Sequence, residues 1–151
     1  MRAKQSVLAI LENYKGIVMV RQIAIFLENQ EGKASACCRV LKEVGVNLLA
    51  LSIADTKDFG ILRILTDNNE KAVSALRGAG FLCSVVDLVG LEVSDKPGAL
   101  SDLLISLGEN NINVEYMYSY AEADGHAKIV FKTSAVEKAL EVLTAAGAKL
   151  L

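Results

Sequence analysis

The sequence predicts an α+β protein made of two βαββαβ units, each a four-stranded antiparallel sheet with two helices on one face. Two observations lead to this fold class. The pattern of apolar residues recurs along the chain at a nearly constant spacing, and each copy alternates short strand-like runs with two amphipathic helical runs. This is the order of a ferredoxin-like unit, present twice.

The duplication is visible when residues 25–53 are compared with residues 91–119. The two stretches correspond at a separation of 66 residues, which becomes 67 after the middle loop. A one-residue slip in a loop is the change that a duplicated unit tolerates best. The corresponding pairs include Gly32 and Gly98, Asn47 and Asn113, and Gly80 and Gly147.

Each copy contains the elements of one unit, separated by turn residues. In the first copy we expect strands at 22–28, 46–54, 60–66 and 81–86, and a helix at 69–78. In the second copy we expect strands at 88–94, 112–121 and 127–132, a helix at 135–145 and a short last strand in the terminal residues AKLL. The remaining helix of each copy follows its first strand and shows apolar residues at the spacing of one helix face. These residues are Ala34, Cys37, Cys38, Leu41 and Val44 in the first copy, and Leu100, Leu103, Leu104 and Leu107 in the second.

The repeat divides the chain into a unit at 20–87 and a unit at 88–151, with no long linker between them. Residues 1–18 lie outside the repeat. There Val7, Ile10, Leu11 and Tyr14 have the spacing of an amphipathic helix, so we expect an N-terminal helical extension.

Composition and charge narrow the classes of partner. Hydrophobic residues make up 52% of the 151 residues, yet no apolar run approaches the ~18 residues of a membrane helix. The high content of hydrophobic residues predicts that part of the surface is buried against another copy, most simply in a homodimer. We expect no membrane association. The 16 basic and 18 acidic residues form no basic stripe, which argues against nucleic-acid binding. Three cysteines without C-x-x-C spacing, and no A-x-A cleavage site, indicate the reducing cytoplasm.

The sequence offers no constellation for catalysis. Its one histidine, His126, is expected in a solvated turn between strands. No P-loop, G-x-G-x-x-G, H-E-x-x-H or Ser-His-Asp pattern is present, and the three cysteines do not cluster as zinc ligands. We therefore predict that the protein is not an enzyme and uses no metal or cofactor.

The two turns that follow the first strands are better candidates for binding, at 29–33 and 94–99. A helix N-terminus presents free N–H groups to a carboxylate, and glycine allows a ligand to approach the backbone closely. Pro97, the only proline, is expected to rigidify the start of the helix. Asp95 upstream is suited to bind an ammonium group, whereas Asn29 is a neutral acceptor. The plainer interpretation is that Asp95 caps the helix and nothing binds.

The duplication, the element order and the stretch VSDKPGAL…NINVEYMYS together resemble tandem ACT domains over residues 20–151. The resemblance implies regulatory, amino-acid-binding modules whose effector lies at the turn after the first strand. Carried over, it implicates Ser94, Asp95, Pro97, Gly98, Ala99 and Leu100 in the second unit, Asn29, Gln30, Gly32 and Lys33 in the first, and Asn113 and Asn47 at the start of the adjoining strands. The first unit departs from the pattern because Glu31 replaces the proline, so its site is expected to be altered or lost.

Two functional hypotheses remain open at this point. The first is a non-catalytic regulatory protein that binds an amino acid or similar small zwitterion and acts on a separate metabolic enzyme. The alternative is a structural module that dimerises or docks on such an enzyme without a ligand of its own.

Overall fold

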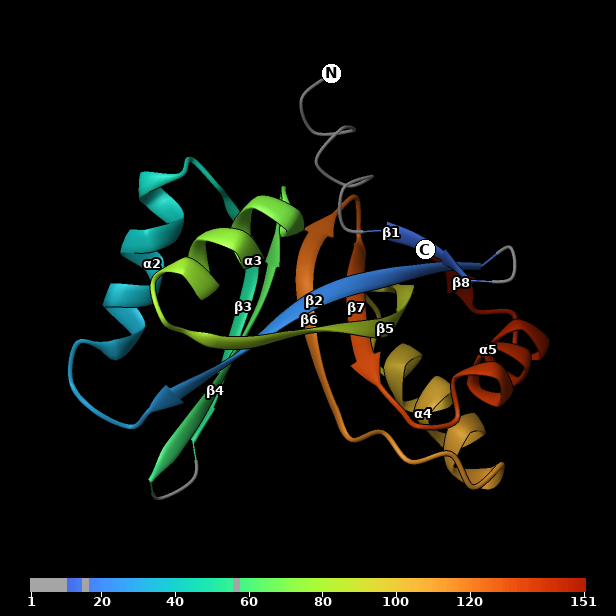
Figure 1. The fold of residues 1–151 in the computed structure, drawn as a ribbon. Helices are drawn as coiled ribbons and strands as arrows, with labels where there is room; N and C mark the ends of the chain where they lie inside the picture. The colour runs from blue at the N-terminus through green and yellow to red at the C-terminus, as the bar shows by residue number, and fades with distance from the viewer. Residues whose placement is uncertain (1–10, 15–16, 56–57) are drawn as a thin grey trace. The chain divides into compact units, whose positions relative to one another are not determined.

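The computed structural model describes residues 11–14, 17–55 and 58–151 (Figure 1). These residues form two compact units. Among the described residues, unit 1 contains Leu11 and Arg21–Val86, and unit 2 contains 12–14, 17–20 and Asp87–Leu151. The boundary after residue 86 lies one residue from the expected one. Within the described part of the chain, no helix has the length and apolar character needed to cross a membrane.

Unit 1 has the order βαββαβ. Its elements are the part of β2 (Ile17–Glu28) from Arg21 onward, α2 (Lys33–Glu43), β3 (Leu48–Asp55), β4 (Phe59–Thr66), α3 (Asn69–Gly78) and the first part of β5 (Leu82–Ser94). Its strands lie in the order β3-β4-β2-β5, and β4 runs antiparallel to both β3 and β2.

Unit 2 repeats this arrangement. Its elements are the second part of β5, α4 (Ala99–Glu109), β6 (Tyr116–Ala123), β7 (His126–Lys132), α5 (Val136–Ala145) and β8 (Lys149–Leu150). The strand order is β6-β7-β5-β8, and each of these neighbouring pairs is antiparallel. The predicted fold class is therefore confirmed in both units.

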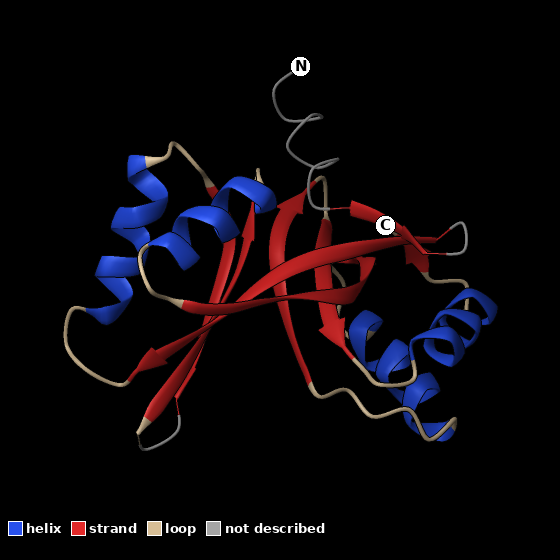
Figure 2. Ribbon diagram, viewed as in Figure 1, coloured by secondary structure: helices blue, strands red, loops and turns tan. Residues whose placement is uncertain are grey.

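Each unit buries one face of its sheet beneath two helices, drawn in blue in Figure 2. Alternate residues of a strand point to the same face, which is why every second residue of β2 and β5 enters a core. Burial of one such aliphatic side chain stabilises the fold by about 1.5–3 kcal/mol. The core of unit 1 includes Ile23, Ile25, Leu62, Ile64, Leu41 and Leu76, and that of unit 2 includes Val89, Leu91, Val93, Phe131, Leu107 and Leu143.

Two strands predicted as separate, 81–86 and 88–94, are one continuous strand, β5. The repeat assigns them to different copies, with the polar Asp87 between them. In the structure Asp87 is exposed, and an exposed carboxylate is compatible with extended backbone. Neither glycine nor proline stands beside it to turn the chain.

The predicted N-terminal helix is wrong over 11–14, because Leu11–Tyr14 forms strand β1, paired with β2. β2 begins at Ile17, earlier than expected, and Leu11–Tyr14 pairs with its backbone as a strand. The rest of the predicted helix lies outside the described residues.

A register shift between Ser119 and Ala121 interrupts the alternation along β6. Tyr116 and Tyr118 lie opposite Lys132 and Val130, whereas Tyr120 falls at the shift. Tyr116 and Tyr118 therefore keep the alternation of the strand, and the shift removes Tyr120 from it.

The close approach of the C-terminus to β5 explains Gly90. A Cβ atom there would lie 2.7 Å from Val20 Cγ2 and 2.8 Å from Leu151 Cδ1. We expect Gly90→Ala to lower the free energy of unfolding by about 1–3 kcal/mol through overpacking, measured by urea denaturation.

The matched control is Gly108→Ala in α4, where an added Cβ has nothing within 4 Å. Because alanine favours helix more than glycine, this change should raise the free energy of unfolding by up to about 1 kcal/mol. Equal effects of the two substitutions would contradict the packing assigned to Gly90.

The three cysteines differ in accessibility. Cys37 and Cys83 are buried in the core of unit 1, and Cys38 is exposed. Burial raises the pKa of the Cys37 thiol to about 12. We expect dithionitrobenzoate to modify Cys38 rapidly in the folded protein and the two buried thiols only after unfolding, because the thiolate is the reactive form.

Cys38→Ser should remove the rapid phase and leave the slow one, whereas rapid modification of all three thiols would contradict this burial.

The raised pKa of Cys37 also makes the free energy of unfolding depend on pH. Between the ordinary thiol pKa of 9.0 and about 12, the folded protein keeps a proton that the unfolded chain releases. The contribution of Cys37 to the free energy of unfolding is therefore complete below pH 9 and declines above it.

Candidate functional site

The turns that connect the first strand to the first helix have the same backbone in both units. In unit 2, the Asp95 N–H donates to Gly125 O at 2.7 Å and thereby ties the turn to the β6–β7 hairpin. In unit 1, the Asn29 N–H donates to Asp58 O at 3.2 Å in the corresponding place. Three further backbone hydrogen bonds of unit 2 recur in unit 1. In unit 2, Lys96 N–H donates to Ser94 O, Ala99 N–H to Lys96 O, and Asp102 N–H to Gly98 O. The corresponding bonds of unit 1 are Gln30 N–H to Glu28 O, Lys33 N–H to Gln30 O, and Ala36 N–H to Gly32 O.

A left-handed glycine ends both turns. Gly98 has φ 91° and is the N-cap of α4, and Gly32 has φ 80° and is the N-cap of α2. The sequence had suggested that Pro97 stands at the start of the helix. In the structure Pro97 precedes the N-cap residue and lies outside the first helical turn. Since Glu31 occupies the equivalent place in a turn of the same geometry, glycine rather than proline determines the shape.

Asp95 does not cap the helix. The N-cap of α4 is Gly98, and no side chain makes a capping hydrogen bond there. The alternative assignment of Asp95 as a helix cap is therefore wrong. Within the described residues, its exposed carboxylate makes no hydrogen bond or ion pair.

A hollow of about 340 Å³ opens beside the turn of unit 2. Strands β5, β6 and β7 and the start of α4 supply its walls. Its lining residues are Val93, Ser94, Asp95, Lys96, Leu100, Met117, Tyr118, Ser119, Ala127 and Ile129. The floor is thus largely aliphatic, and two exposed charged side chains of opposite sign, Asp95 and Lys96, stand side by side at its border.

The structure brings together three of the predicted residues of unit 2, Ser94, Asp95 and Leu100, in this hollow. Pro97, Gly98 and Ala99 shape the turn but do not line the hollow, and neither does Asn113, which is exposed beyond the end of α4.

The predicted residues of unit 1 occupy a turn with different side chains. Asn29, Gln30 and Gly32 are exposed, and the Lys33 ammonium lies 3.2 Å from a Glu28 carboxylate oxygen. Asn47 has a structural role, because its N–H donates to Asp67 Oδ1 at 2.9 Å and its carbonyl accepts from the Asp67 N–H at 3.1 Å.

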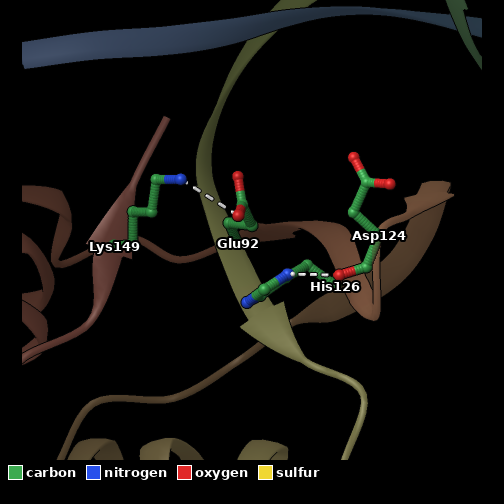
Figure 3. A network of polar contacts seen from close by, with 4 residues as sticks. All are labelled: Glu92, Asp124, His126 and Lys149. Atoms are coloured by element: carbon green, nitrogen blue, oxygen red, sulfur yellow. Dashed lines mark hydrogen bonds and ion pairs between the residues drawn. The ribbon is translucent and has the colours of Figure 1, made fainter.

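The charged residues around the β6–β7 hairpin form surface contacts, not an acid–base pair (Figure 3). His126 is exposed, with Nδ1 3.0 Å from Asp124 O. Lys149 Nζ donates to Glu92 Oε1 at 3.0 Å, and this hydrogen bond lowers the pKa of Glu92. Glu92 and Lys149 are directly opposite each other in the paired strands β5 and β8. Among the described residues, no group of three or more His, Cys, Asp or Glu side chains is placed to hold a metal ion.

Residues 18–150 match the protein family described as "ACT domain pair". The chain belongs to this family. The ACT pair is a regulatory type of domain. The resemblance seen in the sequence is therefore confirmed.

Solved structures agree with this assignment. Protein BT0572 from Bacteroides thetaiotaomicron is 38% identical with a TM-score of 0.81, covering 88% of this chain and 92% of that one. The ligand-free regulatory subunit of aspartate kinase from Thermus thermophilus is 15% identical with a TM-score of 0.58, covering 82% and 89%. The second match shows a common fold alone. No curated protein was found to match this ACT pair.

Reasoning from the sequence missed most of the floor of the hollow, including Met117, Ser119 and Ala127 on β6 and β7. Ala127 reaches the hollow by pairing opposite Val93, a register that the sequence alone does not give. Lys96 was also missed, although it stands within the quoted turn.

The equivalence of the two turns gives a test of what shapes them. Gly98→Ala should lower the free energy of unfolding by roughly 1–2 kcal/mol, because an L side chain is strained at positive φ. Pro97→Glu, which copies unit 1, should change it by less than about 1 kcal/mol. Chemical denaturation of both variants measures the difference, and a larger loss for Pro97→Glu would contradict the role given to glycine.

Proposed function

We propose that this ACT pair is a non-catalytic regulatory protein that binds an amino acid, or a similar small zwitterion, in the hollow beside residues 94–100. The observation that carries the proposal is the Asp95 carboxylate, exposed at the border of an aliphatic hollow and engaged by no described side chain. Such a carboxylate is suited to bind an ammonium group.

The carboxylate of the ligand has partners on the same turn. Lys96 lines the hollow, and α4 has no side-chain cap at its N-terminus, where among the first three N–H groups only that of Ala99 has a described backbone acceptor, Lys96 O. Val93, Leu100 and Ile129 offer apolar surface to the remainder of the ligand. At about 340 Å³ the hollow is at the small end of ligand pockets, which suits a molecule of amino-acid size.

Exposed apolar residues on the edge strand β3 support a homodimer as part of this proposal. Leu51 and Ile53 are 58% and 55% exposed, although they lie opposite the buried Ile64 and Leu62. A further apolar surface at such an edge is suited to a second copy or to a separate metabolic enzyme that responds to the ligand. The free thiols are consistent with a place in the reducing cytoplasm.

The experiment is isothermal titration of the full chain against the twenty amino acids. Micromolar binding corresponds to ~8 kcal/mol, of which we expect the ion pair with Asp95 to contribute a part and the apolar contacts and remaining hydrogen bonds the rest. We expect binding of at least one amino acid, and Asp95→Asn should weaken that binding about tenfold to a hundredfold.

The matched control is Asp102→Asn, which removes an exposed carboxylate from the first turn of α4 outside the hollow. Its affinity should equal that of the unchanged protein. Absence of binding across the whole panel, or equal affinity in Asp95→Asn, would overturn the proposal and leave the ligand-free docking module as the function.

A further inference from the structure

A second hollow, of about 560 Å³, lies in unit 1 and shares no residue with the predicted site. It is bordered by β2, by one face of α3 and by β5. Its lining residues are Arg21, Asn69, Glu70, Val73, Ser74, Arg77 and Val85. Two arginines, one glutamate and two valines are thus among the residues that line the same space.

One wall of this hollow is held rigidly. Asn69 is buried, with Oδ1 accepting from Thr66 Oγ1 at 2.8 Å and Nδ2 donating to Arg21 O at 3.1 Å. These bonds hold the start of α3 against β2. Arg21 and α3 are thereby fixed relative to each other, which gives the hollow a defined shape.

The α3 residues in the lining share one helix face, because Glu70, Val73 or Ser74, and Arg77 recur at intervals of three or four. Arg77 is exposed, and its Nη2 donates to Cys83 O across 3.5 Å. This long bond engages one of the five donors of a guanidinium.

The fold does not require arginine at these positions. The repeat places Asp87 at the position of Arg21 and Thr144 at the position of Arg77. Unit 2 therefore builds the same elements with no guanidinium at either place. The second helix of a βαββαβ unit therefore forms without an arginine at the position of Arg77.

We propose that this hollow binds a small organic carboxylate, with its anionic group on the arginine side chains and its hydrocarbon part against Val73 and Val85. A planar guanidinium matches a carboxylate with two parallel hydrogen bonds. Among the lining residues, two arginines and Glu70 give a net positive charge, which suits an anion. Inorganic phosphate has no hydrocarbon part to contact Val73 and Val85, so we expect it to bind more weakly than a small organic carboxylate.

The test is a titration of the isotope-labelled full chain with sodium propionate, followed by NMR. We expect saturable shifts of the amide signals of Val73, Ser74 and Val85. Arg77→Gln should weaken binding about tenfold or more, and Arg77→Lys, which keeps the charge but loses the fork, should give an intermediate loss. Because Arg77 is exposed, both variants should retain the spectrum of the folded protein elsewhere.

Arg39→Gln is the matched control, since it removes the same charge from an exposed position on α2 outside the hollow. It should bind propionate as the unchanged protein does, and so should Asp95→Asn, whose hollow is in unit 2. Equal binding in Arg77→Gln would overturn the proposal, and so would inorganic phosphate binding as tightly as propionate. Failure of the amino-acid titration leaves this test unaffected, because it concerns other residues.

Discussion

The passage from strand to helix through a left-handed glycine is the constraint on which each unit depends. Gly32 and Gly98 take φ values of 80° and 91°, which direct the next helix back over the sheet. A backbone hydrogen bond from Asn29 or Asp95 then anchors the turn to the hairpin beyond it. The same geometry leaves the first N–H groups of the helix without a side-chain cap, so the turn that closes the core also presents the candidate binding groups.

Much of the fold could be predicted because apolar periodicity reports directly on burial. The helix predicted at 69–78 agrees with α3, since its apolar residues lie on one face and Asn68 caps it with a side-chain hydrogen bond. The error at 11–14 has a physical origin. Four apolar positions at helical spacing do not reveal that a neighbouring strand has unsatisfied backbone groups, and strand pairing is decided by that neighbour.

The residues of the candidate site that belong to one local motif could be predicted from the sequence, but those contributed by distant strands could not. Ser94, Asp95 and Leu100 are local to one motif and could be named from the sequence. Met117 and Ser119 enter the hollow through strand register, and the bulge after Ser119 changes the alternation at that point. A side chain that reaches a site only through pairing of distant strands leaves little trace in a single sequence.

The duplication kept the backbone and let the side chains diverge. At the turn, unit 1 has Asn29 in place of the carboxylate of Asp95, and it pairs Lys33 with Glu28. On the second helix, unit 1 has Arg77 where unit 2 has Thr144. The two units therefore share one architecture but differ in where charged residues line a hollow, beside α3 in unit 1 and beside the turn before α4 in unit 2. A polar exchange at an exposed position costs the fold little, so such positions could change separately in each copy without loss of the shared backbone.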